Sequence, residues 1–112
     1  MANLETLMQL EQAEGAFKFA ADGELLEHKI RDGSELNSDV LDLLAHLCVA
    51  NIAIATMQAR GWETMTGMQG FYPIKGFTLV GFNWTAIVNQ EFGVVIPNDN
   101  VDYDAAHKIL AS

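Results

Sequence analysis

Scarce residue types narrow the class of this protein before any motif is considered. The chain of 112 residues has one cysteine, two prolines and nine glycines. A single cysteine excludes an intramolecular disulfide framework and a multi-cysteine zinc site. So little proline and glycine excludes a collagen-like, linker-like or low-complexity chain. Half of the residues are apolar, which fits one globular domain over residues 1–112.

Basic residues are also few, with six lysines and arginines against fifteen acids and a net charge of −9. Nucleic acids and anionic membrane surfaces both bind clustered basic residues, so we expect neither as a partner. The first residues lack the basic and long apolar regions of a signal peptide. No charge-free stretch flanked by Lys or Arg reaches the length of a membrane span. We therefore expect a cytoplasmic protein.

The order of secondary-structure elements follows from hydrophobic periodicity and from turn residues. Asp22-Gly23 predicts a tight hairpin with a type I′ turn. Asn37 or Ser38 is expected to cap a long helix that ends at Gly61. The full prediction is a helix from Asn3 to Gly15, strands at 16–20 and 24–31, the long helix to Arg60, strands at 77–82, 85–89 and 92–97, and a helix at 101–110.

The long helix is the most informative segment, because no residue from Leu47 to Met57 is charged. A helix that is apolar all round is buried all round. The sheet can cover one face, and the simplest cover for the other is the same helix of a second copy. The alternative is a cover within one subunit, made by the last helix and residues 62–75. The dimer interface that we predict contains Leu44, Leu47, Cys48, Asn51, Ile52 and Ala55.

The segments Leu4–Leu7, Glu14–Phe17 and Ala21–Leu26 resemble the start of roadblock/dynein-light-chain domains. Gly61-Trp62 and Gly70–Pro73 are similar to a family of uncharacterised bacterial proteins of this length. The resemblance implies an α+β fold of the order α-β-β-α-β-β-β-α. Its five-stranded, profilin-like antiparallel sheet would carry two short helices on one face and the long helix on the other.

The same resemblance implies a homodimer built on the long helix and on adjacent edge strands. It also implies a non-enzymatic scaffold or regulator, with a partner such as a Ras-like GTPase or an enzyme complex. Fold alone does not fix function, so these are expectations by analogy.

Catalytic, cofactor and metal sites lack a sequence signal. No glycine-rich phosphate loop is present, and no histidine or cysteine pair has metal-ligand spacing. His46 and Cys48 are two positions apart on a helix, so their side chains point in different directions. No carboxylate is singled out among the fifteen. We expect no catalytic residue, no cofactor and no metal, with a centre at Cys48 or a carboxylate as the enzyme alternative.

Aromatic and methionine side chains gather between residues 61 and 84, interleaved with glycine. Such a segment can roof the sheet, form a partner surface or line a small-ligand pocket. Trp62, Phe71, Tyr72 and Trp84 are the predicted partner or ligand surface, since Trp and Tyr are enriched among interface anchors. The leading hypothesis is a homodimeric scaffold that binds a protein partner. The alternative is a sensor domain with a ligand pocket near this segment.

Overall fold

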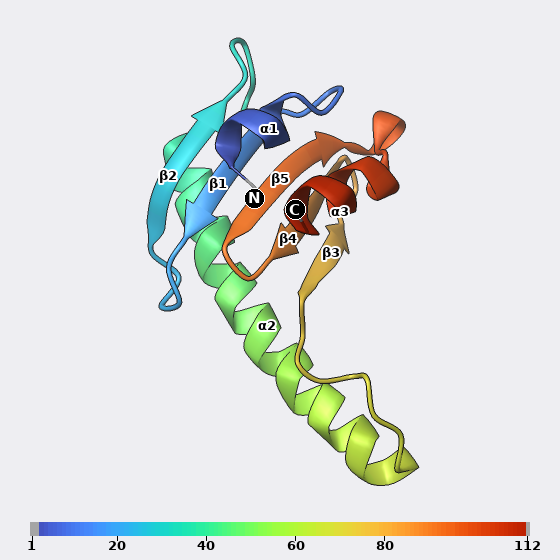
Figure 1. The fold of residues 1–112 in the computed structure, drawn as a ribbon. Helices are drawn as coiled ribbons and strands as arrows, with labels where there is room; N and C mark the ends of the chain where they lie inside the picture. The colour runs from blue at the N-terminus through green and yellow to red at the C-terminus, as the bar shows by residue number, and fades with distance from the viewer. Residues whose placement is uncertain (1–2, 112) are drawn as a thin grey trace.

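The computed structural model describes residues 3–111, and these form one sheet with helices on both faces (Figure 1). The order of elements is the predicted one. The elements are α1 (Leu4–Met8), β1 (Gly15–Phe19), β2 (Leu25–Ile30), α2 (Ser38–Thr66), β3 (Gly76–Val80), β4 (Trp84–Asn89), β5 (Phe92–Pro97), a 3-10 turn (Asn98–Asn100) and α3 (Tyr103–Ala111).

The five strands form one antiparallel sheet in the order β2-β1-β5-β4-β3. The hairpin β1–β2 and the meander β3–β4–β5 are joined where β1 pairs with β5. In that pairing Gly15 lies opposite Val95, and Lys18 lies opposite Phe92. The two edges of the sheet are therefore β2 and β3.

Each face of the sheet carries its own hydrophobic core. On one face α1 and α3 pack on the sheet through Leu4, Leu7, Ala106 and Leu110. On the other face α2 packs on it through Leu41, Ala45 and Cys48. This is the arrangement that the resemblance to roadblock domains implies, with two short helices opposite one long helix (Figure 1).

The core beneath α2 is centred on Phe17, which is fully buried. Phe17 lies directly opposite Gly93 across the β1–β5 pair. A Cβ atom at position 93 would lie 2.4 Å from Cζ of the Phe17 ring. Gly93 is therefore required because the aromatic ring occupies the space that any larger residue would fill.

Two helix ends differ from the prediction. The first helix ends at Met8, and Gly15 is instead the first residue of β1. The long helix passes through Gly61 and ends at Thr66, where Gly67 adopts the left-handed conformation with φ 70°. The N–H of Gly67 donates to the carbonyl of Glu63, which closes the last turn. At 1.5 Å per residue, α2 is about 44 Å long, whereas a helix that ended at Arg60 would be about 34 Å long.

The hairpin between β1 and β2 has the predicted position but a different turn. A type I′ turn needs positive φ at both central residues. Gly23 has a positive φ of 93°, but Asp22 does not have a positive φ. Within residues 3–111, the one non-glycine residue with positive φ is Gln12, which lies outside this hairpin. The N–H of Gly23 donates to the carbonyl of Ala20 at 2.9 Å, which makes Ala21 and Asp22 the centre of the turn.

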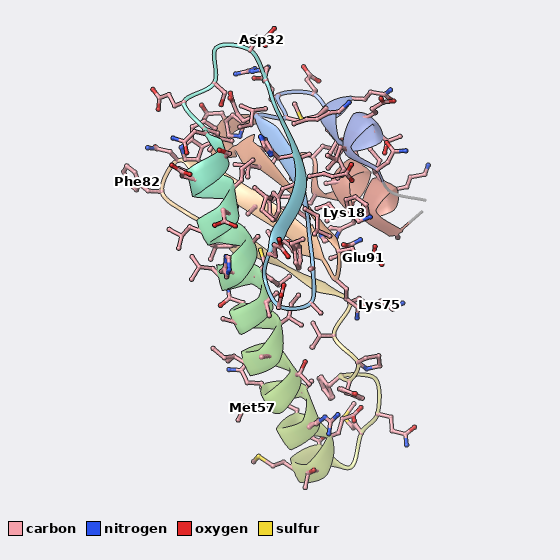
Figure 2. All side chains as sticks on the ribbon, turned by 90° about the vertical axis from the view of Figure 1, so that its left-hand side faces the viewer. Lys18, Asp32, Met57, Lys75, Phe82 and Glu91 are labelled. Atoms are coloured by element: carbon pink, nitrogen blue, oxygen red, sulfur yellow. The ribbon has the colours of Figure 1, made fainter. Side chains whose placement is uncertain are left out.

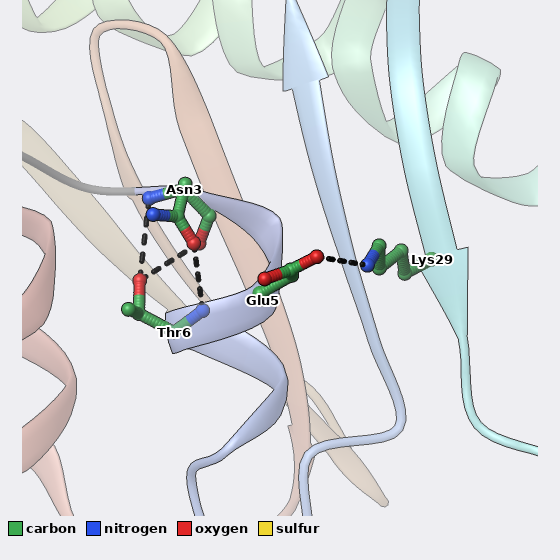
Figure 3. A network of polar contacts seen from close by, with 4 residues as sticks. All are labelled: Asn3, Glu5, Thr6 and Lys29. Atoms are coloured by element: carbon green, nitrogen blue, oxygen red, sulfur yellow. Dashed lines mark hydrogen bonds and ion pairs between the residues drawn. The ribbon is translucent and has the colours of Figure 1, made fainter.

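The short helix α1 is held in place by side-chain contacts (Figure 3). Oδ1 of Asn3 accepts from the N–H of Thr6 at 2.8 Å, and the Thr6 hydroxyl oxygen accepts from the N–H of Asn3 at 3.3 Å. This reciprocal cap satisfies two helix-start donors. Glu5 lies 3.4 Å from the ammonium of Lys29 on β2. A five-residue helix therefore has a defined position over the sheet edge.

Candidate interaction surface

The helix α2 begins where its sequence predicts, because Oδ1 of Asn37 accepts from the N–H of Val40 at 3.0 Å. Asp39 lies in the first turn, where negative charge is favourable. Leu41, Ala45 and Cys48 recur at helical spacing and are fully buried against the sheet. One side of α2 is thus fixed to the sheet along its N-terminal half.

The opposite side of α2 carries an uncovered apolar row, here called the outer stripe. The exposed fractions of Leu43, Leu47, Ile54 and Met57 are 62%, 48%, 55% and 75%. Met57 points away from the sheet in Figure 2. In full, the outer stripe consists of Val40, Leu43, Leu47, Ala50, Ile54 and Met57.

Neither the last helix nor the segment after α2 covers the outer stripe. The helix α3 packs on the other face of the sheet, and the 67–75 segment runs along the sheet-facing side of the end of α2 (Figure 1). The alternative, a cover within one subunit, does not hold for the outer stripe within residues 3–111. A contiguous apolar surface of this kind marks an interaction site.

The six predicted interface residues lie at different depths around α2. Leu47 belongs to the outer stripe, whereas Cys48 is fully buried against the sheet. Leu44 and Ile52 pack at the edge of the sheet-facing core. The other two, Asn51 and Ala55, are half-buried.

Sequence reasoning missed Leu43, Ile54 and Met57, although a signal for them existed. Leu41, Ala45, Cys48 and Ile52 follow the i, i+4, i+7 pattern of the sheet-facing side. Once that phase is set, the remaining large apolar residues must lie on the other side of the helix.

By length and composition alone, α2 is apolar enough to cross a membrane. A helix that packs on a sheet along one side can have the same length and composition. The buried contacts of Leu41, Ala45 and Cys48 place α2 in that class. The outer stripe is therefore the exposed side of a helix whose other side packs on the sheet.

The second half of α2 and the segment that follows it project beyond the sheet as an arm, defined as residues 55–75 (Figure 1). The rings of Trp62 and Phe71 lie 5.6 Å apart. The guanidinium of Arg60 lies 4.4 Å from the Tyr72 ring centre and donates to its hydroxyl at 2.9 Å. These two contacts fasten the returning chain to the helix.

The predicted partner surface is only partly assembled. Trp62, Phe71 and Tyr72 meet in the arm, with 59% of Trp62 and 41% of Tyr72 exposed. Trp84 starts β4 and packs into the core between α2 and the sheet, away from the other three. A shallow hollow of about 300 Å³ opens in the arm, and it is lined by Ala55, Gln58, Ala59, Trp62, Phe71 and Ile74.

A larger hollow of about 540 Å³ lies between the start of β3, the β4–β5 turn and the end of α3. Its walls are tied together, because Asn89 donates to the carbonyl of Leu110 at 3.0 Å. Lys75, Glu91 and His107 line it. Figure 2 shows Lys75 and Glu91 at the same end of the sheet. The hollow therefore carries charged groups of both signs.

Groups with catalytic capacity are dispersed over the structure. His46 is exposed on α2, and its Nδ1 lies 2.8 Å from the carbonyl of Asp42. Within residues 3–111, no three His, Cys, Asp or Glu side chains gather as a metal site. The buried Glu14 forms an ion pair with Arg31, which ties the start of β1 to the end of β2.

The thiol of Cys48 is expected to resist modification in the native protein. Burial raises the pKa of Cys48 from 9.0 to about 12, so the thiolate is scarce at pH 8. Because the buried site favours the neutral thiol, folding stability is highest below pH 9 and falls as the pH rises towards 12 and the unfolded chain ionises first. A chromogenic disulfide reagent should react with the thiol only after urea is added. Rapid reaction of the native protein would contradict the burial.

The closure of the arm is expected to depend on Glu63. Its Oε2 accepts from the N–H of Gly70 at 3.0 Å and from that of Tyr72 at 3.4 Å. In Glu63→Ala, hydrogen exchange at these two amides should accelerate at least about tenfold, while the global unfolding midpoint changes little. Exchange read by mass spectrometry tests this, with the exposed Glu91→Ala as control. Unchanged exchange in the arm would show that Glu63 does not hold it.

Three comparisons place this structure among known proteins. The family described as "Uncharacterized conserved protein (DUF2173)" matches residues 3–112. No curated protein matches the sequence. A Roadblock/LC7 domain from Streptomyces avermitilis has a similar structure, with a TM-score of 0.73 and 9% identity over 96% of this chain and 84% of that one.

Two MglB structures are also similar. The gliding protein MglB from Thermus thermophilus has a TM-score of 0.70 and 18% identity, over 95% of this chain and 76% of that one. An MglB with a tetrameric arrangement has a TM-score of 0.74 and 18% identity, over 95% and 75%. At these identities the similarity shows the fold.

Proposed function

This chain belongs to the DUF2173 family of uncharacterized conserved proteins and has the roadblock fold, and from this premise we propose a non-enzymatic, homodimeric scaffold or regulatory module that binds a protein partner. The observation that carries the proposal is the outer stripe. Its side chains Leu43, Leu47 and Ile54 are exposed to solvent, whereas the other side of α2 packs on the sheet.

A second copy of the chain is the occupant that we propose for this surface. The outer stripe runs along a single helix, so it can pair with itself about a two-fold axis. Ala50 lies near its middle and permits close approach of two helices. The edge strand β3 adds apolar surface, because Leu79 and Val80 are exposed there. Pairing of two copies would cover side chains that one chain leaves in water.

The arm is the surface that we propose for a protein partner of another kind. Trp62 and Tyr72 are half-exposed and held in place by ring contacts, as interface anchors require. Met65 and Met68 are exposed beside them and can adapt to a partner surface. The roadblock and MglB neighbours support a regulatory or scaffold role, and we propose a Ras-like GTPase as partner in the cytoplasm.

Sedimentation velocity at micromolar concentration tests the dimer. The expected species has twice the 12.3 kDa mass of one chain, and a clean monomer would overturn the homodimer. The partner is tested separately by adding purified Ras-like GTPases, loaded with GDP or with a non-hydrolysable GTP analogue. A stoichiometric complex that Trp62→Ala abolishes would support the arm as its site. Absence of any complex across the panel would count against a GTPase partner.

A second candidate function rests on the hollow of about 300 Å³ beside Trp62 and Phe71. Its apolar lining fits a small apolar ligand. A thermal-shift screen should then find compounds that stabilise the wild type and not Trp62→Ala. Stabilisation that survives this substitution would place the ligand elsewhere.

A further inference from the structure

The hollow of about 540 Å³ between the start of β3, the β4–β5 turn and the end of α3, here called the end hollow, has no part in the proposed scaffold role. Its floor is the main chain where Gly76 pairs with Asn89 and Phe77 pairs with Val88. A Cβ atom at position 76 would collide with the carbonyl of Val88, so glycine is required there and this part of the floor carries no side chain. The volume lies within the range of small-molecule sites, which is about 300–1,000 Å³.

Side-chain amides hold the walls of the end hollow in place. Nδ2 of Asn89 donates to the carbonyl of Leu110 at 3.0 Å, which fixes the end of α3. Oδ1 of Asn89 accepts from the N–H of Glu91 at 2.8 Å, which shapes the β4–β5 turn. Nε2 of Gln90 donates to the carbonyl of Ile74 at 2.7 Å, which joins this turn to the chain that enters β3. A ligand therefore meets a preformed site and loses little free energy in ordering it.

Three titratable side chains border the end hollow, with Lys75 from the start of β3, Glu91 from the β4–β5 turn and His107 from α3. All three are exposed, whereas the lining residues Val88 and Leu110 are buried, so the charged groups lie at the mouth. Within residues 3–111, none of the three side chains forms a hydrogen bond or an ion pair. Lys75 and Glu91 lie at the same end of the sheet (Figure 2) but do not pair with each other.

From the preformed hollow and these unpaired groups we propose that the end hollow binds a free amino acid in its zwitterionic form. The ammonium of Lys75 and an imidazole N–H of His107 bind the carboxylate of the ligand. The carboxylate of Glu91 accepts from the ammonium group of the ligand. The carbon atoms between the two charged groups lie over the glycine floor, beside Leu110 and Ala111.

Charge favours a zwitterion over a ligand with one charged group. The chain has a net charge of −9, so its overall field repels an anion. A monocarboxylate would also place its charge near Glu91, and a monoamine would place its charge near Lys75. A zwitterion meets an opposite charge at each end and adds no net charge. The outer stripe contributes no residue to the end hollow, so this site does not require the proposed homodimer.

Isothermal titration calorimetry of the full chain tests the ligand class. The probes are L-alanine, β-alanine and 4-aminobutyrate, in which the carboxylate and ammonium groups are progressively further apart. At least one should bind with a Kd of about 1 mM or lower, which a ligand of so few atoms can reach. Propionate and propylamine each keep one of the two charged groups and should bind at least about tenfold more weakly.

Two results of this titration would contradict the proposal. Failure of all three amino acids to bind at about 10 mM would overturn the site. Binding of propionate or propylamine as tight as that of the best amino acid would overturn the zwitterionic class of ligand.

Substitutions at the mouth test the residues. Lys75→Gln and Glu91→Gln should each raise the Kd of the best amino acid at least about tenfold, because each removes one charged partner. Lys108→Gln and Glu27→Gln are the matched controls, since both residues are exposed and neither lines the end hollow. The controls should stay within about twofold of the wild type, and all four variants should keep its melting temperature. An unchanged Kd in Lys75→Gln and Glu91→Gln would overturn the site.

Nuclear magnetic resonance locates the ligand independently of its affinity. The best amino acid should shift the amide resonances of Gly76 and Gln90, which line the end hollow, more than that of Gly23 in the β1–β2 turn. The indole N–H of Trp62 reports on the smaller hollow in the arm and should not shift. Larger shifts at Trp62 than at Gly76 would place the ligand in the arm and overturn the end hollow as its site.

Discussion

Replacing Leu47 by glutamate is expected to convert the proposed dimer into a monomer of 12.3 kDa. Leu47 lies near the middle of the outer stripe, so the new carboxylate would be removed from water twice in each dimer. Burial of an unpaired charge costs several kcal/mol. The dissociation constant should rise at least about 100-fold, because central apolar residues dominate interface energies. Sedimentation velocity over a range of concentrations measures this change.

The control is Leu26→Glu, which makes the same chemical change on the edge strand β2. The exposed fractions of the two leucines are 49% for Leu26 and 48% for Leu47, so exposure alone cannot explain a difference. Leu26→Glu should remain a dimer, and both variants should keep the far-ultraviolet circular dichroism of the wild type. Equal dissociation in the two variants would remove the outer stripe from the interface.

Replacing Phe17 by alanine is expected to produce the largest loss of folding stability. The ring is fully buried at the centre of the core between α2 and the sheet. It lies 5.9 Å from the ring of Phe19, and it fills the space above Gly93. Truncation should lower the free energy of unfolding by about 3–5 kcal/mol, out of a total of about 5–15 kcal/mol. Urea unfolding followed by circular dichroism gives this value.

Phe82→Ala is the matched control, because 98% of this side chain is exposed. It should change the free energy of unfolding by less than about 0.5 kcal/mol. The proposed homodimer would make the unfolding free energy depend on concentration, so both variants are compared at the same protein concentration. A loss below about 1 kcal/mol in Phe17→Ala would mean that the core does not depend on this ring.

The element order was predictable because local signals agree along the chain. The cap at Asn37, the turn at Gly23 and the three-strand meander all lie where their residues place them. The end of α2 was not predictable from Gly61. A glycine inside a helix costs only about 1 kcal/mol. Packing of Trp62 on Phe71 stabilises the extension of the helix to Thr66. This contact forms only when the chain after the helix folds back on it, so the local sequence does not show it.

The sequence analysis predicted that the candidate site lies on the long helix, but it did not identify which side of the helix is exposed. Composition shows that α2 is apolar all round, but composition alone does not say which residues face the sheet. The phase comes from which residues meet the sheet, and Cys48 proves to be one of them. Likewise, nearness in sequence grouped Trp84 with the arm. Strand β3 runs from the arm to the other end of the sheet, and Trp84 begins β4 there, beside the end of β3.

The pairing of β1 with β5 has a consequence for synthesis on the ribosome. Residues 15–19 form the inner strand β1, yet the central strand β5 that pairs with it is completed only at Pro97. At roughly 5–20 residues per second, the nascent hairpin and α2 wait several seconds for that strand to emerge. During this interval α2 has only the β1–β2 hairpin to pack on, and its outer stripe is bare. A chaperone that shields apolar helices would find its longest opportunity here, before the last strand closes the sheet.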